Sequence, residues 1–88
     1  MKEWNLKEEC LTIKLPVEVD HFADTEIRKA TDELFTKHQV RYVVFDFAQT
    51  DFMDSSGIGL ITGRYRQVIN SNGKVYARNL KPSIEKVF

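Results

Sequence analysis

Strand-like and helix-like patterns alternate along this chain of 88 residues, and the alternation restricts its fold more than any other feature. The run Arg41–Phe47 is rich in β-branched and aromatic residues, which favours a mostly buried β-strand. Apolar residues at helical spacing precede it in Phe22–Lys37 and follow it in Ser55–Asn70. Because a helical connection brings the next strand in parallel, this order predicts an α/β domain with a mixed, mostly parallel sheet.

The start of the chain predicts a hairpin. Two strands, Lys2–Lys7 and Cys10–Leu15, should be joined by a tight turn at Glu8-Glu9. Apolar residues alternate in the second strand and recur at helical spacing in the first long helix, so we expect both to face one core. The expected core residues are Leu11, Ile13 and Leu15 in the strand, and Phe22, Ala23, Ile27, Ala30, Leu34 and Phe35 in the helix.

The end of the chain predicts one more strand and a short helix. Ser71-Asn72-Gly73 is a helix-stop and turn signal, and it precedes a strand at Lys74–Arg78. Pro82 suits the first turn of a last helix that runs to Phe88.

Length and charge restrict the function. Residues 1–88 suffice for a single domain, and a domain this short should be of modest stability. Thirteen Lys and Arg balance thirteen Asp and Glu, so no net field attracts nucleic acid or an anionic membrane. Cys10 is the only cysteine, which fits the reducing cytoplasm, and no apolar run approaches the roughly 20 residues of a membrane span. We therefore expect a protein partner, and no cofactor or metal.

A polar elbow, Asp54-Ser55-Ser56-Gly57, follows the buried strand and begins the second long helix. Asp and Ser accept hydrogen bonds from the free amides of a first helical turn, so capping is one interpretation. The other is a switch, because a helix N-terminus favours anions and a phosphate on serine adds about 1.5 to 2 negative charges. The elbow alone leaves both interpretations open.

The second long helix has an unusual side. Helical spacing predicts that its core stripe contains Ile58, Ile61, Tyr65, Val68 and Ile69. Gly59, Leu60, Gly63 and Gln67 then fall on the outer side, with Arg64 and Arg66 flanking them. Each interior glycine costs about 1 kcal/mol relative to alanine, so outward glycines favour a surface that a partner approaches closely. The alternative is a solvated face that tolerates glycines and one exposed leucine.

Asp20 resembles Asp54 in its setting, because it also follows a predicted strand and precedes a helix. Both carboxylates should therefore lie at the same edge of the sheet, as helix caps and as the negative environment of Ser55. Catalysis by Ser55 is not expected. The serine hydrolase elbow has a glycine two residues before and two residues after the serine. Around Ser55 these positions hold Met53 and Gly57, so only half of the pattern is present. The sequence thus predicts a protein that is not an enzyme.

The stretch Phe52–Leu60, followed by Gly63-Arg64-Tyr65, resembles the phosphorylation loop and next helix of the anti-sigma factor antagonists. These are single-domain members of the STAS group (sulfate transporter and anti-sigma factor antagonist), and the sporulation type is nearest. The resemblance runs from Asn5 to Phe88 and is supported by the stretches Leu11–Leu15, Glu18–His21 and Asn79–Pro82.

This resemblance implies a partner switch. The unphosphorylated protein would bind an anti-sigma factor that is a serine kinase, and so release a sigma factor. That kinase would phosphorylate the serine matching Ser55, and a metal-dependent serine phosphatase would reset it. Ser56 matches a second serine that supports the loop or cap. The partner would contact Asp20, Asp54, Ser56, Gly57, Gly59, Leu60, Gly63 and Arg64. The alternative is a STAS scaffold or ligand-binding regulatory domain that is not phosphorylated.

The chain departs from the family pattern at two places. Pro16-Val17 stands where many relatives have a glycine, which predicts a more rigid strand end. The chain also lacks the family's last strand and closing helix after Phe88. The strand Lys74–Arg78 should then be a sheet edge, which predicts either self-association through that edge or a piece of a longer gene product.

Overall fold

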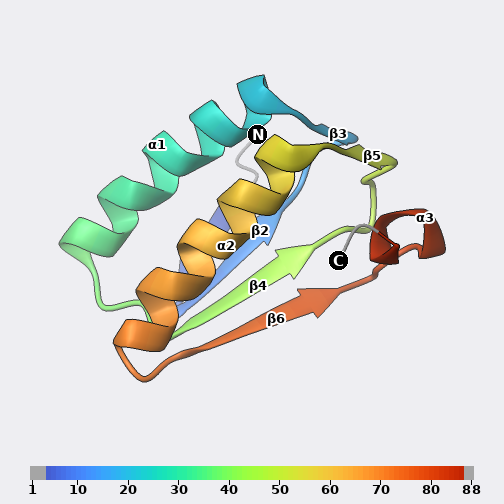
Figure 1. Cartoon of the computed structure of the whole chain (residues 1–88). Helices are drawn as coiled ribbons and strands as arrows, with labels where there is room; N and C mark the ends of the chain where they lie inside the picture. Colours follow the sequence, from blue (N-terminus) through green and yellow to red (C-terminus); the bar gives the residue numbers. More distant parts are fainter. Residues whose placement is uncertain (1–3, 87–88) are drawn as a thin grey trace.

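Residues 4–86, the part of the chain that the computed structural model describes, form a sheet covered on one face by two long helices (Figure 1). The main sheet contains the strands β1 (Trp4–Lys7), β2 (Cys10–Lys14), β4 (Tyr42–Asp46) and β6 (Lys74–Arg78). The helices are α1 (His21–Lys37), α2 (Ser55–Asn70) and the short α3 (Pro82–Glu85). The predicted α/β class is confirmed, and the predicted boundaries of these elements hold to within a residue or two where they are described.

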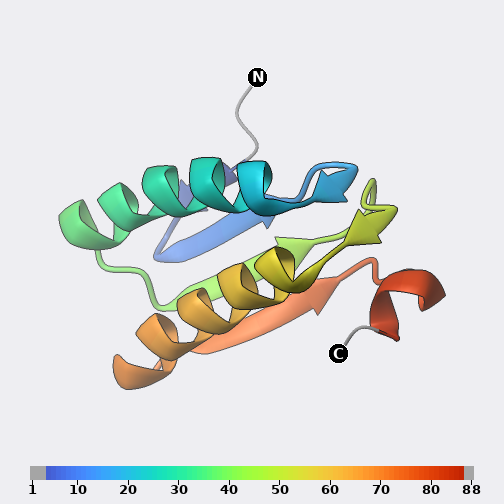
Figure 2. The same ribbon diagram turned by 45° about the horizontal axis from the view of Figure 1, so that its top comes forward.

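The strand order is β1-β2-β4-β6, with β1 antiparallel to β2 and the other pairs parallel. Residues in register share a face, so Leu11 of β2, Val43 of β4 and Val75 of β6 form one row across the sheet. Leu11 and Val43 are fully buried beneath the helices, which stand side by side over this face (Figure 2). β6 is an edge of the sheet, as expected.

A second sheet was not predicted. The strands β3 (Glu18–Val19) and β5 (Phe52–Met53) pair in parallel, just before α1 and α2. Strands of two residues carry no detectable period in the sequence. Thr50 holds them in place, because its buried hydroxyl donates to the carbonyl of Pro16 at 2.8 Å. Val17 then accepts from the amide of Asp51 at 2.8 Å, which starts the pairing.

One residue of the predicted α1 stripe is misplaced. Ala23 and Ile27 are buried, and Leu34 packs against the core as expected. Phe22, however, is 73% exposed. Ala23, Ile27 and Thr31 define the centre of the buried side, and Phe22 lies about 140° around the helix from Ile27. The sequence prediction included Phe22 because it is apolar, although its position is outside the stripe.

The predicted orientation of α2 is wrong in part. Val68 is buried, and Ile58 and Ile61 pack against the core, as predicted. Leu60 is fully buried, together with Gly57, Arg64 and Val68, whereas Tyr65 and Ile69 are 49% and 42% exposed. The spacing of three and four residues in this set is helical, but one of its members is an arginine. A prediction that counts only apolar residues therefore places the core face of α2 too close to Tyr65 and Ile69.

Asp46 fastens the edge strand β6 to the sheet. Its carboxylate accepts from Arg78 at 3.0 Å, from the side-chain amide of Asn79 at 2.9 Å, and from the amide of Ala48 at 2.9 Å. These hydrogen bonds, that of Asn79 above all, hold the pKa of Asp46 below its ordinary range although burial acts the other way. The carboxylate is thus a charged anchor at the end of β4.

The predictions for the two ends of the chain are tested only in part. Lys2 and Val87–Phe88 lie outside the described residues. Pro82 occupies the first turn of α3, as predicted, and Ile84 of that helix is buried in the core. Within residues 4–86, no helix is both long enough and apolar enough to cross a membrane.

Candidate functional site

The small sheet positions two aspartates side by side. Val19 of β3 and Met53 of β5 are in register, so Asp20 and Asp54 follow at matching positions. The Asp20 carboxylate accepts from the amide of Ala23 at 3.0 Å and caps α1. The Asp54 carboxylate accepts from the amide of Ser56 at 2.8 Å and caps α2. The predicted shared edge and the capping interpretation of both aspartates are confirmed.

Ser55 is not needed as a cap. It is the first residue of α2, its side chain is exposed, and its hydroxyl makes no hydrogen bond to any residue in the described range 4–86. Since Asp54 does the capping, the Ser55 hydroxyl is free to meet an enzyme or a partner. Ser56 is half-buried and contributes its amide to the Asp54 cap.

The first turn of α2 offers fewer free amides than the sequence suggested. The amide of Ser56 is bonded to the Asp54 carboxylate, and the amide of Gly57 donates to the Asp54 carbonyl at 3.0 Å. A phosphate on Ser55 would therefore meet a carboxylate that already occupies the helix start. It would have to displace Asp54 or lie beside it at the cost of like-charge repulsion.

The glycines of α2 differ in what surrounds them. A Cβ atom at Gly57 would collide with the side chain of Met53 and crowd Val19, so this glycine lets α2 pack on the small sheet. A Cβ at Gly59 or Gly63 would have no atom within 4 Å. Gly59 is exposed one turn after Ser55, and the room around it is compatible with a close approach by another surface.

Leu60 and Arg64 do not belong to the outer surface where the sequence placed them. Arg64 is 4% exposed, and its Nη1 atom lies 2.8 Å from both the Asp32 carboxylate and the Thr31 hydroxyl of α1. Its guanidinium also stands over the ring of Phe35, 5.7 Å from the centroid. Burial lowers the pKa of Arg64, and the charge of Asp32 opposes this shift. Arg64 is thus a bridge that holds α2 to α1.

Three exposed apolar residues surround the caps and were missed as site candidates. They are Val17, Phe22 and Phe52, which are 50%, 73% and 52% exposed. Phe52 was assigned to the loop, and Phe22 was assigned to the core. Their neighbours in β3 and β5, Val19 and Met53, are buried. The alternation of an exposed and a buried apolar residue in Phe52-Met53 was the available signal. We call Val17, Asp20, Phe22, Phe52, Asp54 and Ser55 the cap surface.

The site thus lies in an α/β domain with a mixed, mostly parallel sheet, two long helices on one face and an exposed serine at the start of α2. Residues 2–88 match the model of the STAS domain family, and the chain belongs to this family. It is similar to a solved structure described as the anti-sigma factor antagonist SpoIIAA in its unphosphorylated form. The TM-score is 0.85 and the identity 33%, over 97% of this chain and 76% of the other. A second similar structure is described as the Bacillus cell fate determinant SpoIIAA in the phosphorylated form. Its TM-score is 0.80 and its identity 33%, over 97% of this chain and 79% of the other.

Curated relatives agree with the structural match. The anti-sigma F factor antagonist of Paenibacillus polymyxa is 30% identical over 77 residues, which is 88% of this chain and 66% of the relative. The anti-sigma F factor antagonist of Lysinibacillus sphaericus is 34% identical over 80 residues, which is 91% of this chain and 68% of the relative. The chain thus spans about two thirds of the length of these relatives. The resemblance to the sporulation type is confirmed, and the chain is grouped with non-enzymatic regulators, as expected.

Proposed function

We propose that this domain is an anti-sigma factor antagonist controlled by phosphorylation of Ser55. In the unphosphorylated form it binds an anti-sigma factor that is a serine kinase, and the sigma factor is released. The observation that carries the proposal is the exposed Ser55 hydroxyl, free of hydrogen bonds within the described residues, beside the capping carboxylate of Asp54. Membership of the STAS family and similarity to anti-sigma F factor antagonists support it.

Phosphorylation acts through charge in this proposal. A phosphate adds about 1.5 to 2 negative charges to a cap surface that already carries Asp20 and Asp54. The apolar part of this surface, Phe22 and Phe52, is suited to lose water when a partner binds. Added charge beside these rings raises the cost of that desolvation, so the partner dissociates.

The partner contacts are proposed to come from the outer side of α2 and from the caps. Asp20, Asp54 and Ser56 shape the start of this surface, and Gly59 and Gly63 allow close approach along the helix. Three other residues first expected to contact the partner, Gly57, Leu60 and Arg64, support the surface from inside.

The remaining components belong to other proteins. The anti-sigma factor kinase brings ATP and its metal ion, and a metal-dependent serine phosphatase removes the phosphate from Ser55. A single cysteine, Cys10, agrees with the cytoplasm as the place of action. The output is a sporulation or stress programme.

Self-association through β6 is a second part of the proposal. β6 is an unpaired edge, and an apolar hollow of about 250 Å³ opens beside it between Ile61, Val75 and Leu80. A free strand edge next to uncovered apolar surface invites pairing between copies, although Lys74 and Arg78 weaken it. Light scattering should show a mass that rises with concentration. A constant monomer mass would contradict this part alone.

The phosphorylation switch is tested with three variants and a cognate anti-sigma factor kinase. Ser55→Ala should bind the kinase and take up no phosphate from ATP, whereas the control Ser56→Ala should still be phosphorylated. Ser55→Asp should lose binding in a pull-down or calorimetric titration. Full phosphorylation of Ser55→Ala would refute the site. Equal binding by Ser55→Asp, with no effect of ATP, would favour the non-phosphorylated scaffold instead.

A further inference from the structure

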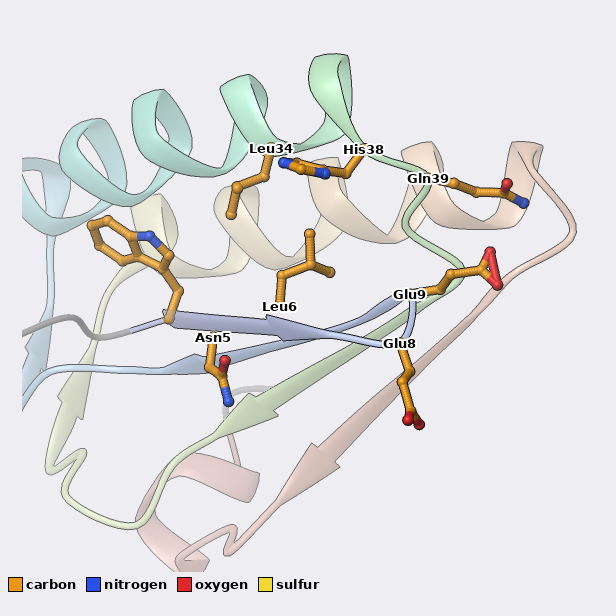
Figure 3. Close-up of a pocket in the computed structure, with 8 residues that line it drawn as sticks. Asn5, Leu6, Glu8, Glu9, Leu34, His38 and Gln39 are labelled. Carbon is orange, nitrogen blue, oxygen red and sulfur yellow. The ribbon is translucent and has the colours of Figure 1, made fainter.

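A large hollow lies between β1 and the C-terminal half of α1. Its volume is about 650 Å³. Leu6 of β1 and Leu34 of α1 face each other across it, and His38 lies close by (Figure 3). Both leucines are half-buried, so apolar surface remains open to solvent here. Leu34 lies more than three helical turns from Asp20, and neither Ser55 nor Asp54 lines the hollow. At its other end, Trp4 also lines a second hollow with Asp20 and Phe22.

The surroundings of the hollow favour a cation. Glu8 and Glu9 line it, and neither a lysine nor an arginine is among its lining residues in the described range 4–86. The C-terminus of α1 adds a partial negative charge, because the carbonyls of a last helical turn lack amide partners. Lys37 of that turn is paired with Glu33 at 2.8 Å, which reduces its effect. The lining of the hollow is therefore acidic, and Lys7 and Arg41 lie beside the turn, where the Arg41 amide donates to the Glu9 carbonyl at 2.8 Å.

The turn beside the hollow is strained. Glu8 and Glu9 both have left-handed backbone conformations, with φ angles of 52° and 68°. Hairpin turns of two residues usually place Asn or Gly at such positions, because other residues lose about 1 kcal/mol or more there. The two glutamates thus occupy backbone conformations that make the turn less stable. Strain of this kind is commonly found at functional sites.

The outer edge of β1 is open for hydrogen bonding. Lys7 and Cys10 flank the turn and pair with each other, so the alternation of an antiparallel ladder directs the amide and carbonyl of Leu6 away from β2. The same holds for Trp4, two residues earlier. Among the described strands, β1 pairs only with β2. An extended chain could add to this edge and place alternate side chains in the hollow.

We propose that this edge and hollow bind an extended segment of a partner protein that alternates apolar and basic residues. The segment adds a strand to β1 through the backbone of Trp4 and Leu6. Its apolar side chains pack between Leu6 and Leu34, and its basic side chains reach Glu8 and Glu9. This contact is independent of the phosphorylation state of Ser55.

A second copy of the chain is a poorer occupant. The other free edge, β6, would direct Val75 and Ala77 toward the helix side, and Lys74 and Arg78 toward the other side. Arg78 is already bound to the Asp46 carboxylate at 3.0 Å, which leaves Lys74 alone for the two glutamates. A partner segment with two or more free basic residues therefore fits the glutamates better.

The chain contains its own reporter, because Trp4 is the only tryptophan and lines the hollow. The probe is a seven-residue peptide that alternates lysine with valine or leucine, and its control carries glutamate in place of lysine. The lysine peptide should change the fluorescence of Trp4 and shift the NMR amide signals of Trp4 and Leu6. The acidic peptide should bind at least about tenfold more weakly, since several charge contacts of up to about fivefold each are reversed.

Variants and modified peptides complete the test. Glu8→Gln/Glu9→Gln should weaken binding of the lysine peptide about two- to thirtyfold at low salt, from two exposed pairs. Glu85→Gln, on α3 beside β6 and outside the hollow, should leave it unchanged, as should Ser55→Asp. Alternate N-methylation of the peptide should abolish binding. Equal affinity of the acidic or methylated peptide, shifts confined to the cap surface, or concentration-dependent protection of Leu6 without peptide would each overturn the proposal.

Discussion

The bridge between α1 and α2 makes a prediction that opposes the usual expectation for an ion pair. Removing the buried cation should be milder than removing its exposed partner. Arg64 has a side chain 5% exposed, whereas that of Asp32 is 51% exposed. The perturbations are Arg64→Met, which keeps most of the side-chain volume, and Asp32→Ala.

The magnitudes follow from the groups that each change leaves behind. After Arg64→Met, Asp32 turns to water, and the Thr31 hydroxyl keeps its bond to the Ile27 carbonyl at 2.7 Å. The lost hydrogen bonds are offset by the removal of a buried charge, so the free energy of unfolding should change by less than about 1 kcal/mol. After Asp32→Ala, the guanidinium stays buried with Thr31 as its main acceptor. The loss of a charged hydrogen bond should then cost about 1.5 to 3 kcal/mol.

Urea unfolding of the two variants and of the double variant provides the measurement. For a domain of this size, about 2 kcal/mol corresponds to a fall in Tm of roughly 8 to 16 °C. The double variant should resemble Arg64→Met, because no buried charge remains to be compensated. A larger loss for Arg64→Met than for Asp32→Ala would refute this account of the bridge. Kinase binding by Arg64→Met should persist, because Arg64 does not reach the surface.

Two further predictions concern packing and pH. Gly57→Ala should destabilise the domain by about 1 to 3 kcal/mol, because the new methyl group meets Met53. Gly59→Ala, its matched control in open space, should stabilise α2 by about 0.5 to 1 kcal/mol; thermal melts that rank the two in reverse would contradict both. The hydrogen bonds to Asp46, led by Asn79, lower its pKa, so its contribution to stability is present above about pH 4 and is lost as the pH falls through the folded-state value. Asp46→Asn should reduce stability at pH 7 and flatten its decline in acid. An unchanged acid limb in urea titrations would exclude this role.

Much of the fold could be predicted from the sequence, because its long elements carry strong periodic signals. α2 and β6 have the predicted boundaries, and the turn at Glu8-Glu9 lies where the hairpin pattern placed it. The pairing of β3 with β5 could not be predicted. It depends on Thr50 and Pro16, which are distant in sequence and are brought together by the pairing of β2 with β4.

The helix starts at the centre of the candidate site could be predicted, but the residues that surround them could not. Asp20, Asp54 and Ser55 were located correctly, since caps and elbows are local features of the chain. Leu60 and Arg64 were assigned to the wrong side. An arginine enters a core only when a neighbouring element supplies its acceptors, and the sequence of α2 does not reveal Thr31 or Asp32. Charge in a helical stripe was therefore taken as a sign of the surface.

The register of β3 with β5 has a thermodynamic consequence for recognition. Both helix starts are fixed by backbone pairing and by their own caps, so the face that a partner meets exists before the partner arrives. A preformed face loses little conformational entropy on binding, and more of the contact energy remains as affinity. A modification of such a preformed face should act mainly on the lifetime of the complex, because changes at one interface alter the dissociation rate more than the association rate.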